Sequence, residues 1–169
     1  MIHYLKNISL EGKLPDNLKE VVLGAGCFWG VEKKFWDLKG IFLTSVGYSG
    51  GETDNPTYED VCTDKTGHAE AIQIEFDPTE ISYSDLVTVF FENHNPTTPN
   101  RQGPDIGIQY RSAIFCHDAE QENTAKEVKE KLNPFAQKTF GSDIVTEIKS
   151  SSKFYRAEEY HQKYFQKNS

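Results

Sequence analysis

Cys27 is the residue of this chain whose type and position most clearly favour chemistry. Three apolar residues at 21–23 predict a buried strand, and Gly24 and Gly26 allow a sharp turn directly before the cysteine. The residues after it predict a helix, so Cys27 is expected where a strand passes into the first turn of a helix. Free N–H groups and the helix dipole stabilise negative charge there, which lowers the pKa of a thiol and favours the nucleophilic thiolate.

An apolar stripe supports the predicted helix and gives the cysteine aromatic neighbours. Positions that share one helix face are apolar at Phe28, Val31, Phe35 and Leu38. Phe28 and Trp29 follow the cysteine directly and are expected to line an apolar pocket beside it. Two other interpretations are an inert, buried cysteine and a nucleotide-binding glycine loop. The second fits poorly, because the spacing is G-x-G-x-x-x-G and not G-x-G-x-x-G.

Glu70 is the second candidate, because a period of two places it on the apolar face of a predicted strand. Ile72, Ile74 and Phe76 alternate with their neighbours, and Glu70 extends the same face. A carboxylate there is costly unless it is paired or protonated, and burial raises its pKa. Glu70 is therefore a candidate general acid. The periodicity fits an alternative equally well, in which the strand starts at Ala71 and Glu70 is a solvated loop residue.

Length, charge and cysteine content limit the possible functions. A chain of 169 residues with 37% hydrophobic and 26% charged residues is typical of a soluble globular protein. The net charge of −8 argues against nucleic acid as a partner. No apolar run approaches the ~20 residues of a membrane span, and no signal peptide is expected. Three cysteines without C-x-x-C or zinc spacing predict no metal site and favour a reducing, cytoplasmic compartment.

Periodicity also predicts the elements that must position these residues. After the first strand and helix we expect strands at 41–46, 71–76, 112–116 and 144–148. We expect further helices from Tyr83, from His117 to about Asn133 before Pro134, and over 158–167. Irregular stretches are expected at 50–68 and 93–110. Residues 1–19 are expected to form an arm and 20–165 the core of a single catalytic domain spanning 1–169. This order predicts an α+β fold, a two-layer sandwich with helices packed on a mixed sheet and a ferredoxin-like core.

With these residues in place, the chain resembles the A-type peptide methionine sulfoxide reductases from about Val21 to about Phe165. The most specific shared motif is Gly26-Cys27-Phe28-Trp29-Gly30. Others follow in the order of that family: Val46-Gly47-Tyr48-Ser49-Gly50-Gly51, Pro56-Thr57-Tyr58, Thr66-Gly67-His68-Ala69-Glu70, Asn100-Arg101-Gln102-Gly103 and Asp105-Ile106-Gly107-Ile108-Gln109-Tyr110-Arg111-Ser112. The resemblance implies an α+β sandwich that reduces the S epimer of methionine sulfoxide, free or in peptides, and so repairs oxidative damage.

The resemblance also implies roles for individual residues. Cys27 looks like the attacking thiolate, and Glu70 like the acid that protonates the sulfoxide oxygen. Phe28 and Trp29 look like the walls that hold the S-methyl group of the substrate. Two hydroxyl donors to the same oxygen and one carboxylate that shapes the site are implied at Tyr58, Tyr110 and Asp105. Taken alone, the two tyrosines are typical of packing residues and the aspartate of a turn.

The other two cysteines bear on how the oxidised enzyme is regenerated. Many members of that family carry resolving cysteines in a glycine-rich C-terminal tail, whereas residues 164–169 contain none. Cys62 precedes Glu70 in a loop, and Cys116 is typical of a small core residue. We therefore expect a one-cysteine mechanism without a bound cofactor, in which thioredoxin, glutaredoxin or glutathione reduces a sulfenic acid on Cys27. The expected substrates are free methionine sulfoxide and oxidised proteins, and the expected enzyme is a monomer that binds no membrane.

Two rival functions use the same residues. A cysteine hydrolase would need Cys27 activated by His68, His94 or His161 within hydrogen-bond reach. A ligand-binding domain would use Trp29 and the tyrosines as an aromatic cage and leave the cysteine as a packing residue.

Overall fold

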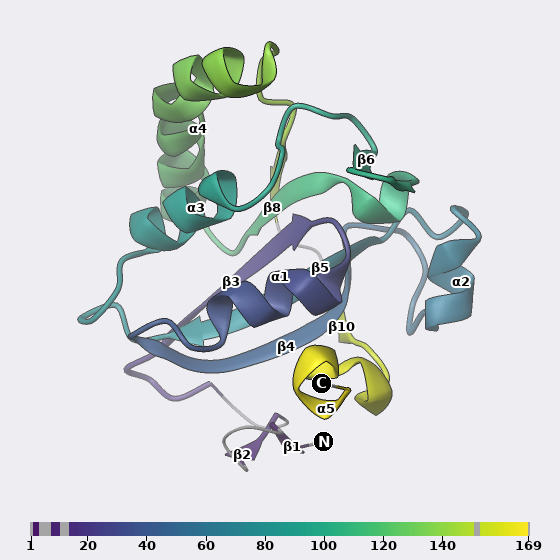
Figure 1. The fold of residues 1–169 in the computed structure, drawn as a ribbon. Helices are drawn as coiled ribbons and strands as arrows, with labels where there is room; N and C mark the ends of the chain where they lie inside the picture. The colour runs from purple at the N-terminus through teal and green to yellow at the C-terminus, as the bar shows by residue number, and fades with distance from the viewer. Residues whose placement is uncertain (1, 4–7, 11–13, 151–152, 169) are drawn as a thin grey trace.

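The computed structural model describes residues 2–3, 8–10, 14–150 and 153–168 of the chain. A six-stranded sheet forms its centre, in the order β10-β4-β5-β3-β8-β9 (Figure 1). Its strands are β3 (Lys19–Ala25), β4 (Ile41–Ser49), β5 (Ala69–Phe76), β8 (Ser112–Cys116), β9 (Glu147–Ser150) and β10 (Phe154–Arg156). Two small sheets lie outside it, formed by β1 (Ile2–His3) with β2 (Ile8–Ser9) and by β6 (Arg101–Gln102) with β7 (Asp105–Ile106).

The strand that leads to Cys27 lies in the middle of the sheet. β3 is antiparallel to β5 on one side and to β8 on the other. β5 pairs along its whole length with β4, and the register sets Glu70 opposite Tyr48. β8 and β9 run parallel, so the sheet is mixed, as predicted. Because both faces of β3 are covered, it has consecutive apolar residues instead of an alternating pattern.

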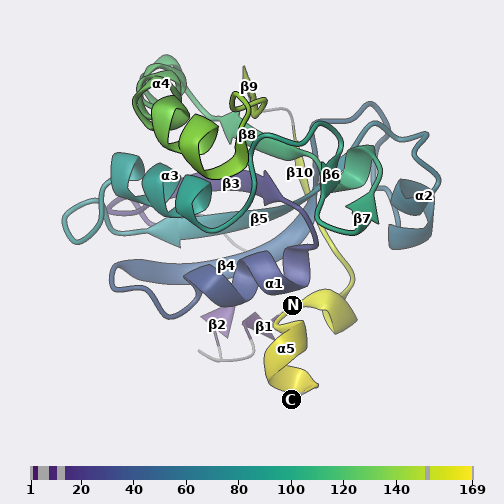
Figure 2. The same cartoon turned by 45° about the horizontal axis from the view of Figure 1, so that its top comes forward.

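Helices cover one face of this sheet. α1 (Phe28–Phe35) and α3 (Tyr83–Glu92) lie in front of it in Figure 1, and α4 (Ala119–Phe140) packs against α3, β8 and β9 (Figure 2). The main core lies between these helices and the sheet, and includes Val21, Leu23, Phe28, Phe35, Ile72, Ile74, Leu86, Phe90, Ile114 and Ala125. A smaller cluster fills the other face, with Val22, Ala69, Ala71, Ala113 and Phe115. The predicted α+β arrangement of helices on a mixed sheet is confirmed.

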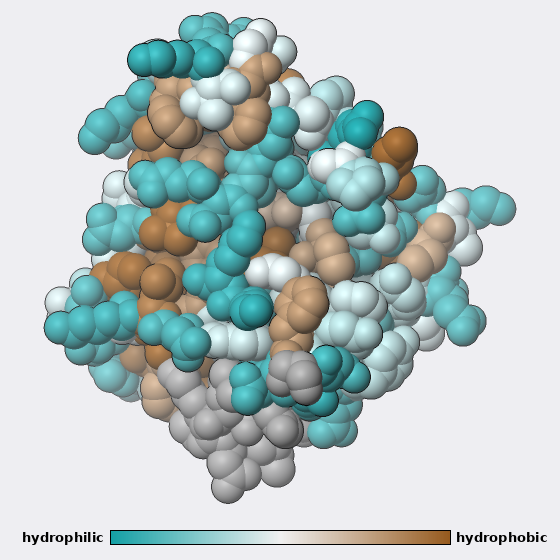
Figure 3. Space-filling model, in the orientation of Figure 1, coloured by the Kyte–Doolittle hydropathy of each residue, from teal (hydrophilic) through white to brown (hydrophobic). Residues whose placement is uncertain are grey.

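The surface is mixed in character. Figure 3 shows a largely hydrophilic face on which apolar side chains gather over α3 and the strand ends beside it. Among the described residues, no helix combines the length and hydrophobicity that crossing a membrane requires. Within the same residues, no three His, Cys, Asp or Glu side chains are grouped as a metal site would need.

Two helices differ from the prediction. The stretch 50–68 contains α2 (Tyr58–Cys62), a short helix that Thr57 and Asp60 begin with a reciprocal capping box. α4 does not stop before Pro134 but continues to Phe140, where Gly141 ends it with a φ of 78°. A proline removes one intrahelical hydrogen bond and bends a helix without necessarily ending it, and the last part of α4 changes direction in Figure 1.

The C-terminal part of the chain also differs from the prediction. The strand expected at 144–148 is β9, which begins three residues later and ends two residues later. It is not the last strand, because β10 follows at the opposite edge of the sheet beside β4. The single helix expected over 158–167 is a 3-10 turn, η2 (Glu159–His161), followed by α5 (Tyr164–Lys167), which contacts α1 (Figure 1). The stretch 93–110 holds β6, β7 and a 3-10 turn, η1 (Ile108–Tyr110). Of the expected arm, residues 1, 4–7 and 11–13 lie outside the described residues, and Lys19 already belongs to β3.

Candidate active site

Cys27 lies where the sequence predicts it, at the N-cap of α1 directly after β3. Gly26 before it has a φ of 95°, and the ideal position of an added Cβ would be only 2.7 Å from side-chain carbons of Gln102. Within the described part of the chain, the side chain of Cys27 makes no capping hydrogen bond. The backbone N–H groups of Trp29 and Gly30 nevertheless act to lower the pKa of the thiol, as expected at a helix start.

The pKa of Cys27 is nevertheless raised above its ordinary value, so the predicted net lowering is wrong. Burial of the thiol, which is only partly accessible to solvent, is the largest cause. The negative charges of Glu70 and Asp105 add to it, because a like charge nearby disfavours a thiolate. The helix start therefore acts on the thiol in the expected sense, but burial and two carboxylates outweigh it.

Glu70 lies inside β5 on the face covered by the helices and is 1% exposed. The strand interpretation is confirmed, and the solvated-loop alternative is wrong. Its Oε1 accepts a hydrogen bond of 3.2 Å from the backbone N–H of Phe28, the residue after the cysteine. Burial raises the pKa of Glu70 to about 7, although this hydrogen bond and one from Gln109 act in the opposite direction. A carboxyl group with such a pKa is neutral in a large fraction of molecules near neutral pH.

Gln109 is a buried residue of the site that the sequence analysis did not single out. It lies in η1, and its Nε2 donates a 3.2 Å hydrogen bond to Oε2 of Glu70. The same amide nitrogen lies 3.6 Å from the sulfur of Cys62 and donates to it. Gln109 belongs to one of the motifs quoted above, but an amide has no titratable proton, so a search for acids, bases and nucleophiles passes over it.

Two tyrosines and one aspartate extend the site. Tyr58 is the first residue of α2, and Tyr110 is the last residue of η1. Burial raises the pKa of Tyr110 to about 12, with smaller contributions from Glu70 and Asp105. The pKa of Tyr58 is raised as well, first by burial and then by a hydrogen bond with the thiol of Cys62. Both phenols therefore remain protonated hydrogen-bond donors at any pH near neutrality.

Asp105 lies in β7, opposite Gln102 of β6, and the two strands form a small hairpin. It acts on the site through its charge, which raises the pKa values of Cys27, Glu70 and Tyr110. Gln102 joins the hairpin to the preceding loop, because its side-chain amide exchanges hydrogen bonds of 2.9 and 2.8 Å with the backbone N–H and C=O of Asn95. The hairpin thereby packs against the turn at Gly26.

Trp29 and Phe28 face different surroundings. The indole of Trp29 stacks on the ring of Tyr164, with centroids 3.7 Å apart, and its Nε1 donates a 2.9 Å hydrogen bond to Nδ1 of His161. Phe28 is 1% exposed and packs in the core, 5.8 Å from the ring of Tyr48 and 5.1 Å from that of His161. His161 and Tyr164 belong to the C-terminal segment, and together with Trp29 they form an aromatic wall beside the cysteine.

Side chains that the sequence analysis missed hold this C-terminal segment in place. Gln162 is fully buried, and its amide exchanges two 2.9 Å hydrogen bonds with the backbone N–H and C=O of Val46 in β4. Lys163 and Glu32 form an ion pair in which both side chains are 0% exposed. Thr44 supports it, because its hydroxyl donates to Glu32 and its carbonyl accepts from Nζ of Lys163. Such a pair is stable only when both charges are also hydrogen-bonded, as they are here.

Each of the three histidines proposed for a hydrolase is hydrogen-bonded to a group other than Cys27. His68 accepts from the N–H of Gly51 and contacts the carbonyl oxygen of Thr53 at 2.7 Å. His94 contacts the carbonyl oxygen of Phe90 and the hydroxyl of Ser112, and burial lowers its pKa to about 4. Nδ1 of His161 accepts from Trp29, and its Nε2 is buried without a hydrogen-bond partner in the part of the chain that the structure describes. Among the hydrogen bonds of the described residues, none joins a histidine to Cys27, so the hydrolase interpretation is not supported.

The remaining cysteines lie in different environments, and all three are free thiols. Cys62 is exposed at the end of α2, where Tyr58 and Gln109 contact its sulfur. Cys116 is 2% exposed in β8, with its sulfur 3.9 Å from the hydroxyl of Tyr83.

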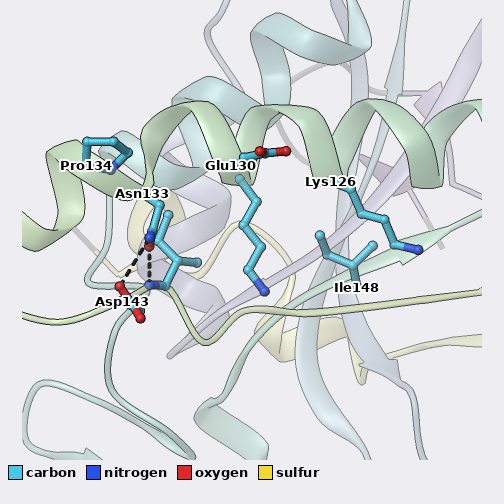
Figure 4. Close-up of a pocket in the computed structure, with 8 residues that line it drawn as sticks. Lys126, Glu130, Asn133, Pro134, Asp143 and Ile148 are labelled. Atoms are coloured by element: carbon cyan, nitrogen blue, oxygen red, sulfur yellow. Dashed lines mark hydrogen bonds between the residues drawn. The ribbon is translucent and has the colours of Figure 1, made fainter.

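A separate hollow lies between α4 and β9 (Figure 4). Its lining includes Lys126, Glu130, Asn133, Pro134 and Ile148, and Asn133 bonds there to Asp143 and to the backbone N–H of Ile144. None of the residues around Cys27 takes part in it.

Comparisons with known proteins agree with this geometry. A family model described as peptide methionine sulfoxide reductase matches residues 19–169. The peptide methionine sulfoxide reductase MsrA of Methanosarcina acetivorans is 53% identical over 152 residues, which are 90% of this chain and 80% of that protein. The solved structure of methionine sulfoxide reductase A of Corynebacterium diphtheriae has a TM-score of 0.92 at 38% identity, covering 98% of this chain and 81% of that one.

A further solved structure is of interest because it includes a second protein. It is Mxr1 from Saccharomyces cerevisiae in complex with Trx2, with a TM-score of 0.62 at 27% identity over 94% of this chain and 91% of that one. The similarity covers sequence and fold together over nearly the whole chain, and on that basis the chain belongs to the peptide methionine sulfoxide reductase family.

Proposed function

We propose that this enzyme reduces the S epimer of methionine sulfoxide, free and in proteins, and so repairs oxidative damage. The observation that carries the proposal is the buried carboxyl of Glu70, bonded to the backbone amide that follows Cys27 and with a pKa near 7. A sulfoxide is a poor electrophile until its oxygen is protonated or strongly hydrogen-bonded. A neutral carboxyl beside a nucleophilic sulfur supplies that proton where it is needed.

The reaction balances with one thiol and one sulfoxide. The thiolate of Cys27 attacks the sulfoxide sulfur while Glu70 gives its proton to the oxygen, and a second proton from solvent, equivalent to the one that the thiol lost, lets that oxygen leave as water. An S–S bond joins Cys27 to a sulfonium at this stage. Water then attacks the cysteine sulfur and gives its proton to the Glu70 carboxylate, the S–S bond breaks, and methionine leaves with the electron pair. The sulfoxide has been reduced by two electrons, and Cys27 has been oxidised to a sulfenic acid.

The other site residues have supporting roles. Tyr58 and Tyr110 donate hydrogen bonds to the developing charge on the oxygen, which two protonated phenols are suited to do. Trp29 and Phe28 hold the S-methyl group, and Asp105 shapes the electrostatic field around the thiol. A fixed chiral arrangement of a nucleophile, an acid and a methyl site accepts one sulfoxide epimer only.

Regeneration uses an external thiol. One thiol attacks the sulfenic acid of Cys27, releases water and forms a mixed disulfide, and a second thiol displaces Cys27 from it. Thioredoxin is the favoured reductant, with glutaredoxin and glutathione as alternatives, and the complex of Mxr1 with Trx2 supports this choice. No bound cofactor takes part. Three free thiols also support a reducing compartment such as the cytoplasm.

We infer three further properties of the chain. Residues 1–169 act as a single catalytic domain and as a monomer, which equilibrium sedimentation tests. The core is ferredoxin-like, because β3, α1, β4, β5, α3 and β8 follow one another as β-α-β-β-α-β within one sheet, with α2 as an insertion between β4 and β5.

The decisive experiment is the reduction of a racemic aryl methyl sulfoxide with dithiothreitol, followed on a chiral column. We expect one enantiomer to disappear and the other to remain. Cys27→Ser is expected to abolish the reaction, and Glu70→Gln to slow it by about 100-fold or more, the usual contribution of a general acid. Cys116→Ala, remote from the site, is the control and is expected to retain activity. Equal consumption of both enantiomers would contradict the proposal.

A further inference from the structure

The amide of Gln109 is bonded to the one carboxyl group on which the proposed reaction depends. Within the described residues, the carboxyl of Glu70 receives two hydrogen bonds, one from the backbone N–H of Phe28 and one from Nε2 of Gln109. The two donors bind different oxygens of the carboxyl, Oε1 and Oε2, and each N···O distance is 3.2 Å. Because each oxygen has its own donor, the plane of the carboxyl group cannot rotate without loss of one hydrogen bond.

The surroundings of Gln109 keep its amide in a single orientation. The residue is 4% exposed, so water cannot easily replace either of its contacts. The second hydrogen of Nε2 is directed to the sulfur of Cys62. The turn that carries the residue is fixed as well, because the guanidinium of Arg111 donates a 2.9 Å hydrogen bond to the carbonyl of Ile108. The amide therefore offers a donor to Glu70 whose position depends on neighbouring elements and not on solvent.

We propose that Gln109 is a positioning residue, which fixes the rotation of the Glu70 carboxyl so that its proton faces the sulfoxide oxygen. The proposal rests on the proposed role of Glu70 as the acid. Gln109 does not touch the reacting atoms in this account, and it acts only through Glu70. Of the two donors to Glu70, the backbone of Phe28 belongs to the helix that carries Cys27, so Gln109 is the donor that a side-chain substitution can remove.

The hydrogen bond from Gln109 also changes the pKa of Glu70. A donor to a carboxylate favours its charged form, and the hydrogen bond from Gln109 lowers the pKa of Glu70 against the larger effect of burial. Without this donor, burial acts with less opposition and the carboxyl becomes a weaker acid. Loss of Gln109 therefore raises the pKa of Glu70 and frees its rotation at once.

A titration of Glu70 tests whether the hydrogen bond from Gln109 acts on its carboxyl group. The carboxyl carbon is followed by NMR in protein labelled with carbon-13 at glutamate, with Glu70→Gln used for assignment. Gln109→Met, close in size but without a donor, is expected to raise the pKa of Glu70 by about one unit or more. Gln121→Met is the matched control, because Gln121 is also buried and bonded, but to the backbone of Glu20 and His117. An unchanged pKa in folded Gln109→Met would overturn the proposal.

A double-mutant cycle tests whether Gln109 acts through Glu70. We expect Gln109→Met to lower kcat by about 10-fold in the wild-type background, as misplacement of a catalytic group does. In the Glu70→Gln background it is expected to cost nothing further, because the carboxyl it positions is gone. An equal loss in both backgrounds overturns the proposal and leaves the acid role of Glu70 intact. Conversely, full activity of Glu70→Gln refutes the acid role, and with it the proposal.

A shorter amide gives a second variant in case the methionine disturbs packing. Gln109→Asn keeps the polar group but withdraws its nitrogen from Glu70 by one methylene. Its effects are expected in the same directions as those of Gln109→Met, both in the titration and in the cycle. A normal pKa of Glu70 together with a normal kcat in Gln109→Asn would also overturn the proposal.

Discussion

Cys27 and Glu70 affect each other through their charges, and this coupling decides which protonation state can react. The charge of ionised Glu70 raises the pKa of the thiol, and that contribution disappears when Glu70 is neutral. The proposed reaction needs the thiolate and the neutral acid together. A pair of groups with such an interaction shares its protons, so apparent pKa values belong to the pair. In the reactive form of this pair, the proton is on Glu70 and the negative charge is on Cys27.

The coupling predicts a change in thiol reactivity when Glu70 loses its charge. In Glu70→Gln, we expect the apparent pKa of Cys27 to fall, because one of the charges that raises it is removed. The measurement is the pH dependence of alkylation of Cys27 by iodoacetamide, in protein that carries Cys62→Ala. Glu75→Gln is the control, because Glu75 lies in the same strand but opposite Glu20 of β3. A pKa that rises or stays unchanged in Glu70→Gln contradicts the coupling.

The pKa of Glu70 also predicts how stability depends on pH. The folded protein holds the proton up to a pKa of about 7, whereas the unfolded chain releases it near 4.5. Folding therefore takes up a proton between these values, and the free energy of unfolding falls as pH rises through this window. The difference corresponds to about 3 kcal/mol. Relative to wild type, Glu70→Gln is expected to gain about 2 to 3 kcal/mol between about pH 5 and pH 8 in urea titrations. A pH-independent difference would contradict the burial argument.

At the residue scale, the sequence predicted the groups that titrate and missed the groups that hold them. Alternation along β5 was enough to propose that Glu70 faces the core, and the structure confirms it. The pKa of Cys27 was predicted in the wrong direction, because a helix start can be read from local sequence but burial and distant carboxylates cannot. Gln109 was missed for a related reason, since its importance depends on a contact across 39 positions of the chain.

At the scale of elements, the C-terminal segment is held by a charge pair that has no access to water. Lys163 and Glu32 are both 0% exposed, and Lys163 has a φ of 54°. Removal of one partner leaves the other charge buried and unpaired, which is far more costly than loss of the pair as a whole. The segment also carries His161 and Tyr164, which contact the indole of Trp29. Stability and the aromatic wall of the site therefore depend on the same element.

Lys163→Met is expected to lower the free energy of unfolding by about 3 to 5 kcal/mol, because it leaves the Glu32 carboxylate alone in the core. Denaturant titration measures the loss. Lys126→Met is the control, because Lys126 pairs with Glu122 on the exposed surface of α4, and it is expected to cost less than about 1 kcal/mol. Addition of Glu32→Gln to Lys163→Met is expected to recover part of the loss. Equal effects of the two lysine variants would contradict this account.

Element boundaries show what local sequence can and cannot specify. α3 was predicted from its apolar spacing to begin at Tyr83, and this is confirmed, with Ser82 and Asp85 forming a capping box at its start. The expected end of α4 at Pro134 was wrong, because a proline signals a lost hydrogen bond and not the packing that carries a helix past it. β10 was missed because it has three residues, and its pairing with β4 is decided by the sheet edge it meets.

At the scale of the whole molecule, the site joins parts of the chain that are far apart in sequence. Cys27, Tyr58, Glu70, Gln109 and the C-terminal segment come from five separate parts of the chain, which the sheet and its connections bring together. The composition and periodicity of the chain predicted the class of fold. They did not predict that the segment after β10 returns to α1 and completes the aromatic wall, because that path depends on buried hydrogen bonds between distant residues.

The positions of the three thiols predict how the whole molecule responds to one turnover. Cys116 is buried in β8, and we expect neither it nor Cys62 to form a disulfide with Cys27. After one equivalent of substrate without reductant, thiol titration is expected to show the loss of one thiol, and intact mass the gain of one oxygen. Loss of two thiols, with a disulfide to Cys62 or Cys116 in the peptide map, would contradict the one-cysteine mechanism. Cys62→Ala is the control and is expected to lose one thiol as well.

The stacking of Trp29 on Tyr164 has a consequence for the order in which the enzyme matures. The ribosome makes Tyr164 135 residues after Trp29, so Cys27 emerges long before the aromatic wall beside it is complete. At typical rates of synthesis this interval lasts roughly 7 to 27 seconds. A nascent chain therefore exposes Cys27 before its C-terminal aromatic neighbours exist, and the stacked pair forms only after Tyr164 has been made.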